Sequence, residues 1–254
     1  MEIFHVGPFF GLLRFGHIVV AVMWMGLLWF FNFVQTPAYA EMEPPARNAA
    51  FDKVTWRALW WFRWAAAATI VFGLLLLMVG SMSDQIGLYK GDYWMHTASG
   101  PTLFLAIVMG VIMFLNVWLV IWPNQQVVIA NARTLLAGGE ANPDAAGAAR
   151  AGAMASRQNT IFSITVLAFM VGAGHFWGAS GEILRFDVGA SKVWLYYIVG
   201  FIIIGVLEAN ALGKISGRGN GGLNVIYESH KNALYTAFGI LVFLYIVGEV
   251  LLRN

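Results

Sequence analysis

Long uninterrupted apolar runs constrain this chain more than any other feature of its sequence. Several segments are long enough to cross a hydrocarbon core of about 30 Å, because a helix rises about 1.5 Å per residue. They cover Phe9–Val34, Trp56–Met82, Ser99–Trp122, Asn159–Ala179, Val193–Leu212 and Asn232–Leu252. The runs do not alternate apolar and polar residues as the strands of a membrane barrel do. We therefore predict an all-α fold, a polytopic integral membrane helical bundle of about six transmembrane helices.

The composition excludes several classes of protein and of site. The chain is 59% hydrophobic and 11% charged, whereas soluble domains carry roughly 25% charged residues. Its net charge of +2 and the lack of a basic run argue against a nucleic-acid partner. It has no cysteine, which excludes disulfides, thiolate metal sites, iron–sulfur clusters and c-type haem attachment. The start, MEIFHVGPFF, lacks the basic region of a cleaved signal peptide.

The spans and their connections indicate a single transmembrane helical domain covering residues 1–254. Pro37 is expected to break the chain after the first span and Pro123 to close the third. The longest connection, at about 124–157, is predicted to be a flexible cytoplasmic loop, with a short surface helix at its front (QQVVIANARTLL). A second, glycine-rich connection, GKISGRGNGGLN, lacks a preceding strand and dinucleotide spacing, so we expect a flexible connector there.

The distribution of basic residues predicts the orientation in the membrane. The first, third and fifth loops and their adjoining helix ends hold ten lysines and arginines, against five on the other side. Because loops rich in lysine and arginine stay in the cytoplasm, we place the first set there. This predicts a multi-pass protein of the bacterial inner (cytoplasmic) membrane with both termini facing the periplasm.

Three of the five histidines are expected at the outer side of the bundle. His17 lies roughly 12 Å from the outer end of the first span, and His175 roughly 6 Å from that of the fourth. His96 comes just before the outer start of the third span. Ionisable groups inside a span are costly and usually face the bundle interior, and imidazole is a common ligand of haem iron. We predict haem b, with His17 and His175 as axial ligands and His96 as an alternative or supporting group.

The helix faces that carry these histidines offer room for a flat ring. Small side chains share the face of His175: Ala168, Val171, Gly172, Gly178 and Ala179. The face of His17 continues through Ala21, Trp24 and Leu28. Arg14 lies one turn further out, where its guanidinium is expected to pair with a haem propionate.

Each of these residues also has a structural interpretation. A histidine within a span can hydrogen-bond across helices and do nothing more, and small residues at helical spacing can serve close packing alone. Arg14 can extend to the outer interface without a ligand. For His5 and His230 we expect no functional role.

Polar residues also gather toward the cytoplasmic ends of the spans. They are Asn32, Arg63, Asn116, Glu208 and Asn210. They are predicted to form a second polar cluster, such as a proton path or an ion site, or else to reach water as groups at helix ends. Arg63 is flanked by tryptophans in WWFRW, which is typical of an interfacial anchor with cation–π contacts.

A set of motifs along the chain resembles a known membrane family. The stretches are HIVVAVMWMGLLWFFNFVQTPAYA, RALWWFRWAAAATIVFGLLLL, NVWLVIWPNQQ and SRQNTIFSITVLAFMVGAGHFW. In this order they resemble the membrane domain of bacterial cytochrome-c-linked urate oxidases, the urate oxidase N-terminal domain. The resemblance covers most of the chain, and its W-x-G-L-L-W-F-F-N and I-W-P-N-Q-Q runs are unusual as a set.

The resemblance implies urate oxidation, with electrons passed through a c-type cytochrome domain outside the cytoplasm. This chain departs from the family pattern, because it ends at LLRN and has no cysteine. Either a partner chain supplies the cytochrome, or the protein is a relative with another role.

The sequence therefore favours a membrane oxidoreductase that binds haem b and passes electrons to a periplasmic cytochrome c or a respiratory complex. A link to urate oxidation follows from the resemblance alone. Two other interpretations remain open. One is a non-redox accessory or assembly subunit of a larger membrane complex, and the other is a small-solute transporter built around Glu208 and Asn210.

Overall fold

The computed structural model describes residues 6–82, 89, 91–175 and 188–252, and the side chains of residues 6 and 173–175 lie outside that description. Within this part of the chain all regular structure is helical. The elements in chain order are α1 (Val6–Trp29), η2 (Phe30–Gln35), α2 (Thr36–Glu41), α3 (Pro44–Ala50), η3 (Phe51–Thr55), α4 (Trp56–Met82), α5 (Gly91–His96), α6 (Ser99–Leu115), η4 (Asn116–Ile121), α7 (Trp122–Leu136), α8 (Ala145–His175), α9 (Ala190–Ala211), η6 (Gly222–Asn224), α10 (Val225–Glu228) and α11 (His230–Leu252). Of these, η2, η3 and η4 are π-helical and η6 is a 3₁₀ turn.

The helices confirm an all-α membrane bundle. Among the described residues, five helical stretches are long and apolar enough to cross a membrane: Gly7–Glu41, Pro44–Met82, Ser99–Leu136, Ala190–Ala211 and His230–Leu252. Large apolar side chains of these stretches, such as Phe15, Leu74 and Ile202, are exposed on the surface of the bundle. Such a surface is stable against lipid and costly in water.

The fourth predicted span, Asn159–Ala179, coincides with the second half of α8, and its residues 176–179 lie outside the described residues. This half of α8 is less apolar because it occupies the centre of the bundle. Helix α8 contacts α1, α6, α9 and α11, and the polar residues around its middle are fully buried: Gln158, Asn159, Thr160, Ser163 and Thr165. Polar groups that have no contact with lipid can be satisfied by neighbouring helices, so this span needs fewer apolar residues than the others.

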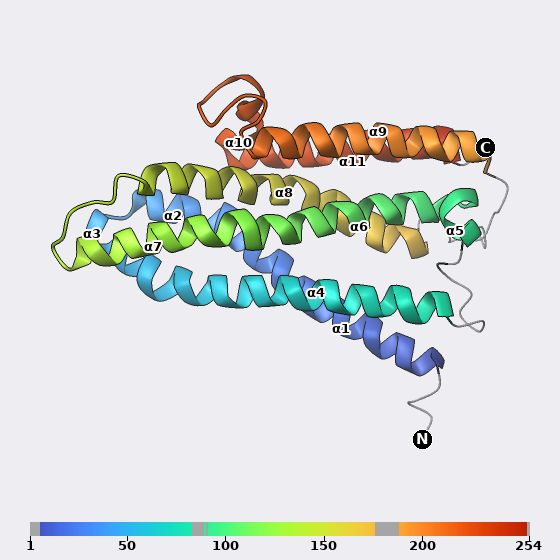
Figure 1. Ribbon diagram of the computed structural model, residues 1–254, viewed down its shortest axis with the longest axis horizontal. Coiled ribbons are helices and arrows are strands. Elements are labelled where there is room, and N and C mark those ends of the chain that lie inside the picture. Colours follow the sequence, from blue (N-terminus) through green and yellow to red (C-terminus); the bar gives the residue numbers. More distant parts are fainter. Residues whose placement is uncertain (1–5, 83–88, 90, 176–187, 253–254) are drawn as a thin grey trace.

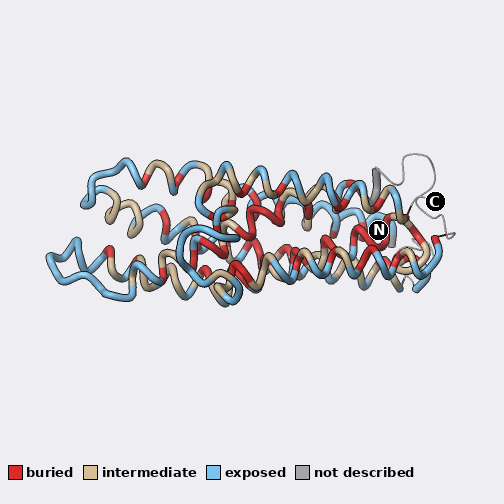
Figure 2. Tube along the Cα trace, turned by 90° about the horizontal axis from the view of Figure 1, so that it is seen from above, coloured by how far each residue is buried: buried red, intermediate tan, exposed pale blue. Residues whose placement is uncertain are grey.

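The long helices lie side by side along one axis (Figure 1). Helices α9 and α11 pack together on one side of α8, and α1 packs along α4 on the other. Buried residues concentrate between the helices, whereas the surface of the bundle is largely exposed (Figure 2). Helix α1 begins and α11 ends at the same end of the bundle, which also carries α5. We call this the α5 end. At the opposite end, α3 and α7 extend beyond α9 and α11.

Pro37 and Pro123 do not end their helices, which is a correction to the predicted boundaries. Each proline stands at the second residue of a helix that continues from a π-helical segment, α2 after η2 and α7 after η4. A proline lacks the N–H group and its ring crowds the carbonyl of the preceding turn. A π-helical turn is wider and shifts the hydrogen bond by one residue, as from the Thr36 N–H to the Phe31 carbonyl. The chain therefore passes each proline without a break.

The segment predicted as a flexible loop at about 124–157 is helical over most of its length. Helix α7 continues to Leu136 and α8 begins at Ala145, so only residues 137–144 connect them. Alanine is the best helix former. Three alanines of α8 are also buried: Ala148, Ala151 and Ala155. Helices α7 and α8 pack against each other here, and the small alanine side chains permit that close approach.

Candidate functional site

His17 lies in the interface between α1 and α4. Its Nδ1 is 3.0 Å from the Thr69 carbonyl oxygen, and since a carbonyl only accepts, Nδ1 carries the proton and donates. The ring fits between the helices because Gly73 has no side chain; a Cβ there would lie 3.2 Å from the Cε1 of His17. His17 therefore makes the hydrogen bond across helices that we expected of a histidine with a structural role. Nε2 has no hydrogen-bond partner among the described residues, so its lone pair stays available.

His96 shows the same arrangement at the end of α5. Its Nδ1 is 3.2 Å from the carbonyl oxygen of Val188, just before α9. Helix α5 is held on α9 by a second contact, in which the Tyr197 hydroxyl donates to the Trp94 carbonyl at 2.8 Å. Burial raises the pKa of Tyr93, one turn before His96, to about 12, so this phenol stays neutral. His96 thus lies at the α5 end of the bundle.

Arg14 and His175 complete the predicted haem site. Arg14 is exposed on α1. Its guanidinium carbon lies 5.3 Å from the centre of the Phe10 ring, and its side chain bonds to Tyr89. His175 is the last residue of α8, but its side chain lies outside the described part of the structure. The predicted pairing of His175 with His17 therefore lies outside the described side chains.

The predicted faces of the two helices are partly buried. Trp24 and Leu28, on the His17 face of α1, are almost completely buried. On α8, Gly172 is buried whereas Val171 is exposed. Gly178 and Ala179 lie outside the described residues. No group of three or more histidines, cysteines, aspartates or glutamates within reach of one metal ion occurs in the described part of the chain.

Part of the second predicted cluster is assembled around Asn116, the first residue of η4. Its Nδ2 lies 3.0 Å from Asn159 Oδ1 on α8 and 3.0 Å from Glu208 Oε2 on α9. Asn159 in turn donates from Nδ2 to the Met113 carbonyl at 2.9 Å. Three helices far apart in sequence are therefore joined at one point. Sequence reasoning named Asn116 and Glu208 but took Asn159 only as the start of a span.

Tyr227 of α10 extends this cluster. Its hydroxyl lies 2.6 Å from Gln158 Oε1 and 2.9 Å from the carbonyl oxygen of Leu207, the residue before Glu208. Burial raises the pKa of Tyr227, and the nearby Glu208 adds to the effect. The Nε2 of Gln158 is buried and has no hydrogen-bond partner among the described residues. Sequence reasoning missed Gln158 and Tyr227; the run of polar residues RQNT was the available signal.

Asn32 joins α8 at a separate point. In η2, its Nδ2 donates to Ser156 Oγ at 2.8 Å and to the Leu28 carbonyl at 2.9 Å. Trp29 adds a bond from Nε1 to Ser163 Oγ at 2.9 Å. These contacts fix α1 against the buried face of α8.

Arg63 belongs to the membrane-interface aromatics rather than to the polar cluster. Its guanidinium carbon lies 3.9 Å from the centre of the Trp122 ring and 5.6 Å from that of Trp118. This geometry matches the predicted interfacial anchor with cation–π contacts.

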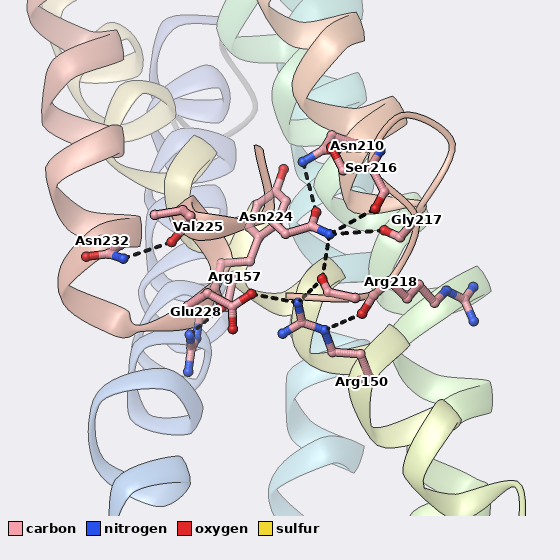
Figure 3. A network of polar contacts seen from close by, with 12 residues as sticks. Arg150, Arg157, Asn210, Ser216, Gly217, Arg218, Asn224, Val225, Glu228 and Asn232 are labelled. Atoms are coloured by element: carbon pink, nitrogen blue, oxygen red, sulfur yellow. Dashed lines mark hydrogen bonds and ion pairs between the residues drawn. The ribbon is translucent and has the colours of Figure 1, made fainter. Parts of the chain in front are cut away.

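The glycine-rich connection 212–224 is an ordered loop built around a buried asparagine, which corrects the expected flexible connector (Figure 3). The Asn224 amide donates to the carbonyls of Ser216 (3.4 Å), Gly217 (3.2 Å) and Gly219 (2.8 Å). It accepts from Asn210 Nδ2 at 3.2 Å. The glycines are needed because Gly213, Gly217, Gly221 and Gly222 have positive φ angles.

Two arginines of α8 fasten this loop and α10 to the bundle (Figure 3). Arg150 donates to the carbonyls of Arg218 and Gly219 at 3.0 and 3.1 Å and pairs with Glu228 at 3.0 Å. Arg157 donates to the Tyr227 carbonyl at 2.6 Å. These contacts hold α10 against α8, where the Tyr227 hydroxyl reaches Gln158.

We compared the chain with known protein families, curated proteins and solved structures. No protein-family model, curated protein or solved structure matches this chain. The resemblance to the membrane domain of cytochrome-c-linked urate oxidases therefore remains a hypothesis that rests on the quoted motifs.

Proposed function

We propose that this protein is a haem b-binding membrane redox protein. The observation that carries the proposal is His17, an imidazole within a membrane span whose Nδ1 is bound to the Thr69 carbonyl and whose Nε2 has no partner among the described residues. Histidines that ligate metals typically donate their other ring N–H to a carbonyl or carboxylate, which fixes the ring and its tautomer. Haem supplies a one-electron carrier when it is bound.

The proposed second axial ligand is His175, at the end of α8. His96 is the alternative, since its Nδ1 is likewise bound to a backbone carbonyl and its Nε2 has no partner among the described residues. Arg14, one turn beyond His17 and exposed, is proposed to bind a propionate at the α5 end. Together these residues offer nitrogen ligands for the iron and a cation for the acidic edge of the ring.

We propose that the α5 end faces the periplasm and delivers electrons to a cytochrome c or to a respiratory complex. The excess of lysine and arginine toward the opposite end supports this orientation. The protein would then lie in the bacterial inner membrane. The motif resemblance further supports urate as the electron donor, so urate-dependent reduction of added cytochrome c by membranes that contain the protein is expected.

The test is the absorption spectrum of the purified protein, produced in cells supplied with a haem precursor. We expect the Soret and α bands of haem b in a reduced-minus-oxidised spectrum. The decisive variant is His17→Asn. An asparagine amide can donate to the Thr69 carbonyl in place of Nδ1, so the contact between α1 and α4 is kept while the imidazole ligand is lost. This variant should fold normally and lose or strongly shift the bands.

The matched control is His230→Asn, because His230 packs edge-on against Phe33 far from the α5 end, with ring centres 6.3 Å apart. It should leave the spectrum unchanged. A folded, colourless wild-type protein, or bands that persist unaltered in His17→Asn, would contradict the proposal. A colourless protein that co-purifies with other chains would instead favour an accessory subunit.

A further inference from the structure

The polar cluster around Glu208 has a use that does not depend on haem. We propose that Glu208 is a proton-binding site, at which the carboxylate takes a proton from hydronium and, in the reverse step, returns it to water. This exchange takes place on the side of the bundle away from the α5 end, where α10 lies, which we call the α10 end. The step transfers one proton and no electrons, and it needs no further reactant.

The first argument is the pairing of the carboxyl group. Glu208 Oε2 accepts a hydrogen bond from Asn116 Nδ2 at 3.0 Å, which is a neutral donor. None of the ion pairs found among the described residues includes Glu208. A carboxylate within a span that lacks a cationic partner is costly, and protonation relieves that cost.

The charged and titratable groups on the neighbouring elements are engaged elsewhere. Arg157 of α8 donates to the Tyr227 carbonyl, and Arg150 pairs with Glu228. His230, at the start of α11, packs against Phe33. Lys214, after α9, is exposed. The Tyr227 phenol is the titratable group beside Glu208, and burial keeps it neutral.

The second argument is a spare donor linked to α9 one residue before Glu208. The Tyr227 hydroxyl contacts both Gln158 Oε1 and the Leu207 carbonyl, so it connects the Gln158 amide of α8 to this part of α9. Gln158 is fully buried, and its Nε2 has no partner among the described residues. A buried donor of this kind suits a water molecule. A water bound there would connect the half-buried Glu208 to the α10 end.

The third argument is the link to a helix segment with unusual geometry. Asn116, which bonds to Glu208, is the first residue of the π-helical segment η4. A hydrogen bond to a carboxylate is stronger than one to a neutral carboxyl group. Protonation of Glu208 therefore weakens the hold of α9 on η4. The proton-binding site is thus coupled to the contacts among η4, α8 and α9.

The experiment is infrared difference spectroscopy of the full chain in lipid vesicles, titrated from acidic to alkaline pH. We expect a carboxylic acid C=O band that is lost as the pH rises and is absent in Glu208→Gln. Glu249→Gln, which alters a carboxyl group of α11 near the α5 end, is the matched control and should retain the band. Asn116→Ala should move its midpoint to higher pH, because the carboxylate loses its hydrogen-bond donor.

Persistence of the band in Glu208→Gln would overturn the proposal. So would a band that responds to sodium ions at constant pH, because the ligand would then be a metal cation. If Glu208→Gln does not fold, Asn116→Ala tests the proposal instead. A midpoint at higher pH supports it, and an unchanged or lower midpoint overturns it. The result is independent of the haem spectrum, so the two proposals can fail separately.

Discussion

Gly100 stands where α5 turns into α6, and its replacement by alanine is expected to destabilise the bundle. A Cβ at this position would lie 2.8 Å from the carbonyl carbon of Tyr93, 3.0 Å from Thr97 Oγ1, and closer still to the Tyr93 carbonyl oxygen. Real Cβ contacts rarely fall below 3.4 Å. The obstacle is backbone, which cannot rotate away as a flexible side chain can. The corner between α5 and α6 must therefore open by more than half an ångström.

Gly110→Ala in the same helix is the matched control. Gly110 is also buried, but a Cβ there would meet nothing within 4 Å. Gly110 lies in the interior of α6, where alanine stabilises a helix by about 1 kcal/mol relative to glycine, whereas Gly100 lies in the first turn and gains less. The difference between the two variants is then the overpacking cost plus part of this helix-propensity term, for which we expect about 2–3 kcal/mol in total.

The assay is unfolding in mixed micelles by added dodecyl sulfate, followed by circular dichroism. Gly100→Ala should unfold at a lower detergent fraction than wild type, and Gly110→Ala at the same or a higher one. Because α5 ends at His96, the first variant should also disturb the contact with Val188. Equal stability of the two variants would refute the inferred close approach of α5 and α6.

Two further predictions concern the end of the bundle opposite α5. Arg63→Lys keeps the positive charge but loses the planar contact with Trp122, so the unfolding midpoint should fall by an amount equivalent to about 1 kcal/mol; an unchanged midpoint would contradict the cation–π contact. Asn224→Ala removes the amide that binds three loop carbonyls, so residues 213–221 should exchange their amide hydrogens much faster, with a local loss of about 2 kcal/mol. Exchange at the wild-type rate would show that the loop does not depend on this side chain.

Much of the fold could be predicted from the apolar runs because a span must satisfy its backbone internally, and helices do this within one segment. The helix ends could not be predicted in the same way. Pro37 and Pro123 are helix breakers by local chemistry, yet each follows a π-helical segment that accommodates it. The connection at 124–157 is composed like a linker, but buried contacts of Ala148 and Ala151 stabilise it as a helix.

For the candidate sites, the sequence predicted which residues take part and their depth in the membrane, but not the residues they contact. His17, Asn116 and Glu208 could be identified because an ionisable or amide group within a span is costly and is usually retained for a structural or functional role. Their neighbours depend on how the helices pack. Thr69 and Gly73 on α4 receive the imidazole of His17, which no spacing along α1 indicates.

The sequence by itself determined the class of the protein, the approximate positions of its spans and the presence of polar residues within them, since these depend on composition and on helical rise. Only the tertiary structure decided that α8 is the central helix and that Asn116, Asn159 and Glu208 meet. These residues are more than forty positions apart in the chain, and the contacts form because buried polar groups must find partners on neighbouring helices. The same packing placed the glycine-rich loop around Asn224, where a local pattern predicted only a connector.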